Sequence, residues 1–287
     1  MLKSKLKKLL CGVLATSAIV GCAGTLSACE TSRPEMQMKL SFNGQSYILN
    51  YELYRKIAPA TVSHFMKLVE NDYYDGMCVH NYTSSKMYSG VYSYDSAIEQ
   101  DNGLVYKDYY TLAQAFGVPT RVFEDEALTK PTYTLYGEFK KNGGFSISNG
   151  DFLKQTFGSL TMYYTEKTDN DYTAFVKQHS GTVAERSYEL NSATSEFFIS
   201  LSTSSTSSSA YCTFATLKGG SADALTKLKD AIADYIDAKD DEDYSFTESV
   251  EMVVDQDDPF IGGEGQTVSY ALPKEPIVIE YITITKY

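Results

Sequence analysis

Residues 51–82, YELYRKIAPATVSHFMKLVENDYYDGMCVHNY, constrain the fold more than any other part of the chain. An alternating segment leads to Pro59, and proline is tolerated in the first turn of a helix because its missing N–H has no acceptor there. Val62 and Phe65 then recur at helical spacing, before a turn at Gly76 and a second apolar run. We therefore expect a strand, an amphipathic helix, a turn and a strand in quick succession.

Composition limits the classes of protein that this chain resembles. Its 287 residues are 43% hydrophobic, which suffices for the core of one large domain or two small ones. The net charge of −12 argues against a nucleic-acid surface, because phosphate binding requires concentrated Lys and Arg. The 24 tyrosines, with no tryptophan, suit a β-rich fold with amphipathic surfaces.

The N-terminal segment is typical of a targeting sequence. Four lysines precede an uncharged apolar run over residues 9–28, and Cys29 is followed at once by polar residues. This resembles a bacterial lipoprotein signal, which predicts a signal peptide over 1–28, lipid on Cys29, a tether over 29–37 and a membrane-anchored protein at the extracytoplasmic face. Cys22 also fits the lipidation pattern, and an uncleaved membrane helix is the alternative, since about 20 apolar residues span a bilayer.

Two cysteines remain after this processing. Cys78 and Cys212 sit in apolar, strand-like runs, so we expect buried thiols; a disulfide between them is the alternative in an exported protein. With three scattered histidines, they make no metal site of recognisable spacing, and nothing in the chain calls for a cofactor.

Further elements follow from local patterns. Asn43-Gly44 between two alternating segments predicts a β-hairpin over 38–54. Ser221 is the expected N-cap of a helix over 221–236, whose apolar face repeats every three to four residues. The other expected elements are strands over 77–80, 87–92 and 276–285, a short helix over 110–116 and a flexible serine-rich loop over 202–209.

Several of these segments carry motifs in a common order. They are APATVSHF at 58–65, DYYDG at 72–76, GSLTM at 158–162, SATSEFFI at 192–199 and YCTFA at 211–215. They resemble the cyclophilin family of peptidyl-prolyl cis-trans isomerases. The resemblance implies a mainly β domain over 38–287: a closed, antiparallel, eight-stranded barrel capped by two helices, with large insertions near 93–134, 165–190 and 238–265. Closure removes exposed strand edges. An unrelated α+β domain is the alternative.

The resemblance also implies a site, in which the family uses an arginine, an apolar proline pocket and polar groups that hold the peptide. Asn81 stands at the arginine position. Lys86 replaces a pocket phenylalanine, Met87 keeps the pocket methionine, and Ser89 replaces a glutamine. Asn81 offers two neutral donors where arginine presents five with a permanent charge, so we expect catalysis to suffer. Lys86 is the alternative source of a cation.

The remaining positions of the implied site are mixed. Tyr163 replaces a small residue, Phe198 keeps the pocket floor, and Tyr211 falls where some members have His and many bacterial ones have Tyr. Phe198 and Met87 have a structural interpretation as well, namely barrel core.

Two functions follow from the resemblance. The first is an exported isomerase, of weak or lost activity, that assists the folding of secreted proteins by acting on proline-containing segments. Rotation about an X–Pro bond requires no nucleophile, metal or cofactor. The second is a non-catalytic peptide- or protein-binding module on the same fold. The inserted regions offer a third possibility, a separate partner surface.

Overall fold

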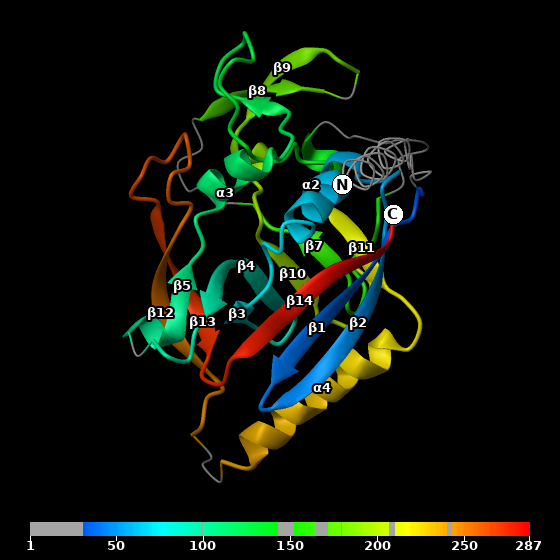
Figure 1. Ribbon diagram of the computed structural model, residues 1–287, viewed down its shortest axis with the longest axis vertical. Helices are drawn as coiled ribbons and strands as arrows, with labels where there is room; N and C mark the ends of the chain where they lie inside the picture. Colours follow the sequence, from blue (N-terminus) through cyan, green and yellow to red (C-terminus); the bar gives the residue numbers. More distant parts are fainter. Residues whose placement is uncertain are drawn as a thin grey trace, which may run out of the picture. The chain divides into compact units, whose positions relative to one another are not determined.

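The structure is a computed structural model that describes residues 31–98, 100–142, 152–164, 172–178, 180–206, 210–239 and 243–287 (Figure 1). The chain divides into two units, Met1–Thr31 with Tyr287, and Ser32–Lys286. All elements below belong to the second unit. The expected signal peptide and Cys29 lie outside the described residues, as do 207–209 of the serine-rich loop. No helix within the described ranges combines the length and apolar character needed to cross a membrane.

Eight strands form a closed antiparallel barrel, which confirms the predicted fold class. Their order is β10-β7-β11-β2-β1-β14-β3-β4, and β4 pairs with β10 to close the ring. Strand β5 (Leu104–Tyr106) extends the sheet beyond β4. The barrel strands are β1 (Glu35–Phe42), β2 (Gln45–Leu53), β3 (Met77–Tyr82), β4 (Lys86–Tyr94), β7 (Leu160–Met162), β10 (Phe197–Ser200), β11 (Thr213–Leu217) and β14 (Ile277–Lys286).

The hairpin of β1 and β2 forms as predicted. Asn43 and Gly44 both adopt positive φ, +46° and +74°, the backbone that a two-residue hairpin turn requires and that Asn and Gly tolerate best. The expected tether over 29–37 is too long, however. Strand β1 already begins at Glu35, which pairs with Lys286 of β14, and Met36 fills a fully buried core position. Residues 35–37 therefore belong to the barrel.

In the described part of the chain, three helices accompany the barrel: α2 (Pro59–Val69), α3 (Tyr109–Phe116) and α4 (Ser221–Asp237). The resemblance implied two; α3 is the short helix expected near 110–116, within the first insertion. The predicted N-cap of α4 is wrong. Gly220 is the N-cap residue and no side chain caps the helix. The buried Ser221 hydroxyl instead accepts a hydrogen bond, 2.8 Å long, from the backbone N–H of Asn50 on β2.

Helix α2 is held at its N-terminus by a distant carboxylate. Glu138 is 1% exposed and accepts hydrogen bonds from the backbone N–H groups of Ala60 (3.0 Å) and Thr61 (2.9 Å) and from the Thr61 hydroxyl (2.7 Å). Because the first N–H groups of a helix lack intrahelical acceptors, this carboxylate satisfies donors that α2 leaves open.

The insertions fold against one another. The first and second contribute a three-stranded sheet, β6-β8-β9. The third contains β12, which pairs with β13 in a two-stranded sheet of its own, so the acidic region 238–265 ends inside a β-hairpin. The bounds are β6 (Val122–Phe123), β8 (Thr173–Lys177), β9 (Val183–Ser187), β12 (Thr247–Val254), β13 (Gln266–Pro273) and the 3-10 turns η1 (Gln100–Gly103), η2 (Lys140–Asn142) and η3 (Glu189–Asn191).

Three apolar clusters form among the described residues. One packs around the β6-β8-β9 sheet and consists of Val122, Tyr136, Ala174, Val176 and Tyr188; the other two concern the barrel. The larger fills the barrel under α2, where the Phe65 ring lies 4.8 Å from Tyr74 and 5.0 Å from Phe214. The smaller joins β3, β4 and β5 to the β12–β13 hairpin. Its buried members are Cys78, Val91, Tyr92, Met252, Val254 and Tyr270. The hairpin is therefore attached to the barrel through side chains, beside the strands that carry Asn81 and Met87.

Candidate functional site

An aromatic cluster lies where β4, β7, β10 and β11 meet. We use this name for Tyr88, Tyr163, Tyr164, Phe198 and Tyr211. Tyr88 lies 5.4 Å from both Tyr163 and Phe198, and Tyr211 lies 5.8 Å from Phe198 and 5.3 Å from Tyr164, all measured between ring centroids. The structure thus brings together three of the expected site residues, Tyr163, Phe198 and Tyr211.

Strand register decides which residues join this cluster. Phe198 pairs with Tyr88 across the β10–β4 ladder, so both side chains point to the same face of the barrel wall. The next pair, Ile199 and Met87, points to the other face, into the barrel core. Phe198 is fully buried and yet lies outside that core cluster, so it belongs to the outer face.

Lys86 lies over the aromatic cluster. Its Nζ is 4.3 Å from the centroid of the Phe198 ring, 5.4 Å from that of Tyr211 and 5.8 Å from that of Tyr88. A cation over aromatic faces at these distances is attracted by the ring quadrupoles. The resemblance implies an apolar phenylalanine at the position of Lys86. This structure has a positive charge there instead, over Phe198, the expected pocket floor.

Met87 and Ser89 occupy different surroundings from those the resemblance implies. Met87 is 1% exposed within the barrel core. Ser89 is 2% exposed, and its hydroxyl donates a 2.7 Å hydrogen bond to the backbone carbonyl of Cys78. Both side chains are therefore buried; of the two interpretations of Met87, core packing matches its position.

Asn81, at the expected arginine position, contacts the inserted hairpin. Its Oδ1 accepts a 3.2 Å hydrogen bond from the backbone N–H of Ala271 on β13. The residue before it, His80, is fully buried, and its Nε2 lies 3.0 Å from the Glu196 carboxylate. Tyr270 packs on the His80 ring at 5.2 Å; burial, and then the Glu196 charge, raise the pKa of the Tyr270 phenol. The β12–β13 hairpin thus covers β3 at the implied site.

The two remaining cysteines are free and buried, as expected. Burial raises the pKa of the Cys78 thiol to about 12, and it raises that of Cys212 further. In the part of the chain that the structure describes, no group of three or more His, Cys, Asp and Glu side chains is placed to hold a metal ion. His179 lies outside that part.

Comparison with known families decides the relationship. The family model described as cyclophilin type peptidyl-prolyl cis-trans isomerase/CLD matches residues 37–253, well over half of the chain. The chain belongs to the cyclophilin family. No curated protein is similar enough to count as a match.

Solved cyclophilin structures resemble this chain at low identity. A Cryptosporidium parvum cyclophilin type peptidyl-prolyl cis-trans isomerase is 16% identical, with 89% of this chain and 99% of that one covered and a TM-score of 0.39. The same protein in the presence of the dipeptide Ala-Pro is also 16% identical, with 88% of this chain and 99% of that one covered and a TM-score of 0.39. The Mimivirus cyclophilin is 14% identical, with 90% and 91% covered and a TM-score of 0.39.

Sequence reasoning missed two features of this cyclophilin's site. It did not expect the hairpin contact of Ala271 and Tyr270 with β3. The signal for that hairpin was the alternation in TESVEMVV and QTVSYALP, which strongly acidic neighbours obscured. It also did not expect Tyr88 to join the cluster, because the family motif assigns a pocket role to Met87, the residue before Tyr88 on the strand.

Proposed function

We propose that this cyclophilin is exported, held at the extracytoplasmic face by lipid on Cys29, and used there to bind polypeptide segments, with weak or no isomerase activity. Unfolded secreted proteins are the proposed clients. One observation supports weak activity. The Lys86 ammonium lies 4.3 Å from the centroid of the Phe198 ring, and it occupies the space over that ring that a bound proline ring would need. Entry of a proline ring would require Lys86 to leave that contact.

The electrostatics point the same way. The Asn81 amide oxygen already accepts from Ala271, and asparagine supplies no permanent charge to the prolyl amide. Charge-assisted hydrogen bonds are about twice as strong as neutral ones. A loss of about 3 kcal/mol in transition-state stabilisation lowers a rate more than a hundredfold, so weak activity is the outcome we derive.

The aromatic cluster supports peptide binding. Tyr88, Tyr163 and Tyr211 are each partly exposed. Tyrosine buries a large apolar surface at low entropic cost and can hydrogen-bond at its tip, which is why it is enriched in binding hot spots. A cluster of partly exposed tyrosines beside the covered Asn81 therefore retains a means of binding peptide where the means of catalysis is reduced.

The test combines binding and catalysis on one sample. An Ala-Pro-containing peptide is titrated into the protein, with amide shifts reporting binding and exchange spectroscopy reporting cis-trans interconversion. We expect shifts at Tyr88 and Tyr163 and interconversion close to the uncatalysed rate. Rapid interconversion by the unchanged protein would instead establish the isomerase function, which family membership supports. Absence of any shift would overturn peptide binding.

A paired variant separates a lost catalytic group from a lost fold. Asn81→Arg with Lys86→Phe restores the residue types that the family uses at both positions. We expect the double variant to accelerate interconversion, and Asn81→Gln with Lys86→Met to leave it unchanged. If both pairs behave alike, the two substitutions do not explain the weak activity.

Lipid anchoring has its own test. Metabolic labelling with an alkyne fatty acid in a bacterial host should mark the unchanged protein and the Cys22→Ser variant, and it should not mark Cys29→Ser. Label that persists in Cys29→Ser and disappears in Cys22→Ser would move the anchor to Cys22. Absence of label from the unchanged protein would overturn lipidation.

A further inference from the structure

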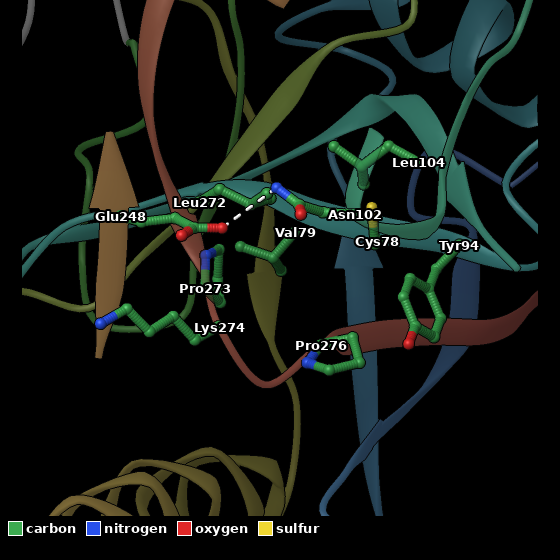
Figure 2. Close-up of a pocket in the computed structure, with 10 residues that line it drawn as sticks. All are labelled: Cys78, Val79, Tyr94, Asn102, Leu104, Glu248, Leu272, Pro273, Lys274 and Pro276. Atoms are coloured by element: carbon green, nitrogen blue, oxygen red, sulfur yellow. Dashed lines mark hydrogen bonds between the residues drawn. The ribbon is translucent and has the colours of Figure 1, made fainter. Parts of the chain in front are cut away.

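A cavity lies between the first insertion, the β12–β13 hairpin and β3. Its volume is about 230 Å³, and it shares no lining residue with the aromatic cluster (Figure 2). Asn102 and Leu104 line it from the first insertion, Glu248 from β12 and Leu272 from β13, while Cys78 on β3 forms part of its floor. Because none of the residues expected at the family's site lines this cavity, the two sites are separate.

The two insertions are joined at the rim of this cavity. The side-chain amide of Asn102 donates a 3.0 Å hydrogen bond to one carboxylate oxygen of Glu248, which Figure 2 shows as a dashed line. Asn102 is neutral, so this bond orients the carboxylate without cancelling its charge. Within the described ranges, it is the one side-chain hydrogen bond recorded for Glu248.

Lys274 also lines the cavity, but Figure 2 shows its ammonium pointing away from Val79 and Tyr94. The Lys274 ammonium lies over the Tyr244 ring, 5.0 Å from its centroid. Figure 2 shows Glu248 and Tyr94 on opposite sides of Val79, so a ligand between them would meet a carboxylate at one end and an aromatic ring at the other. Carboxylates and aromatic faces both attract cations.

We propose that this cavity binds a small organic cation, an amine with one apolar ring or a short aliphatic body. The volume fits, since an engineered apolar cavity of about 150 Å³ is large enough for benzene. Leu104 and Leu272 supply apolar walls, and Glu248 supplies the charge that selects the amine. The net charge of −12 also draws cations toward the protein.

Three probes of matched shape test the charge preference: phenethylammonium, benzyl alcohol and phenylacetate. Each is titrated into the isotope-labelled protein while amide shifts are recorded. We expect phenethylammonium to bind most tightly and to shift the amides of Leu104 and Leu272, and phenylacetate to bind most weakly. If phenylacetate binds most tightly, or no probe shifts these amides, the proposal is refuted.

Two variants assign the effect to the cavity. Glu248→Gln should weaken phenethylammonium about fivefold, the size of one solvent-exposed ion pair, and leave benzyl alcohol unchanged. Glu251→Gln, on the same strand, exposed and outside the lining, is the matched control and should change neither. Leu104→Trp should fill the space and abolish binding of all three probes while the remaining amide spectrum is retained. Equal affinities in Glu248→Gln, or binding that survives Leu104→Trp, would place the ligand elsewhere.

Discussion

The side chain of Asn81 on β3 and the backbone N–H of Ala271 on β13 form a 3.2 Å hydrogen bond between residues that lie 190 positions apart in the sequence. Strands β12 and β13 pair with each other in a sheet separate from the barrel sheet. This bond, together with the smaller apolar core, is therefore part of what attaches the inserted hairpin to the barrel. The position where the family places its arginine serves here as an attachment point.

Asn81→Ala should loosen the hairpin. The substitution removes the acceptor for the Ala271 N–H, and the loss of one such bond costs about 1 kcal/mol. We expect faster hydrogen exchange at the Ala271 amide and a small fall in the free energy of unfolding. Asn81→Asp keeps an acceptor oxygen at the same reach and is the matched control. Unchanged exchange in Asn81→Ala would show that the apolar core alone holds the hairpin.

Glu138→Ala should be strongly destabilising. Glu138 is buried and accepts three hydrogen bonds at the N-terminus of α2, so its removal leaves the donors of Ala60 and Thr61 unsatisfied. We expect a loss of roughly 2–4 kcal/mol in the free energy of unfolding, measured by chemical denaturation. Glu264→Ala, an exposed site, should cost little. Equal losses in the two variants would contradict the capping role.

Cys78 should react slowly in the folded protein. Burial raises the pKa of its thiol from 9.0 to about 12, so at pH 8 the thiolate fraction is about a thousandfold smaller than that of an exposed cysteine. Iodoacetamide labelling, followed at the level of individual peptides, should be slow at Cys78 and Cys212 in the native state and fast in denaturant. Rapid native labelling at Cys78 would show that the hairpin opens often.

Local patterns were sufficient for the first hairpin and for helix α2, and the family resemblance implied the barrel. Both failed where residues far apart decide the structure. The Asn43-Gly44 turn and the helix beginning at Pro59 depend on neighbouring residues, whose chemistry a sequence displays directly. The contact between Asn81 and Ala271 depends on a hairpin packing across β3, which no neighbouring residue encodes. The sequence therefore identified Asn81 as an unusual substitution without indicating what it binds.

The orientation of β4 shows the same limit. Adjacent residues of a strand face opposite sides, so a one-residue difference in pairing exchanges the side chains at a surface for those in the core. The motif alignment selected Met87 and Ser89, whereas pairing with β10 places Tyr88 beside Phe198 and buries Met87. That register is fixed by contacts between distant strands, so only the folded structure reveals it.

His64 should make stability fall in mild acid. This histidine on α2 is fully buried, and burial lowers its pKa from 6.5 to about 4, although a hydrogen bond to the Thr194 carbonyl partly opposes the shift. Above pH 6.5 the residue is neutral in both states and has no effect. Between pH 6.5 and 4 the unfolded chain takes up a proton that the folded protein refuses, so this group lowers the free energy of unfolding as pH falls.

The size and the control follow from that window. One group contributes up to about 1.4 kcal/mol per pH unit, or roughly 3 kcal/mol across the whole interval. His64→Gln keeps a side-chain donor for the Thr194 carbonyl and cannot titrate. We therefore expect the difference in unfolding free energy between the unchanged protein and His64→Gln to shift in favour of the variant from pH 6.5 to 4, measured by urea denaturation at several pH values. Parallel curves for the two proteins would mean that His64 is protonated in the folded state over this range.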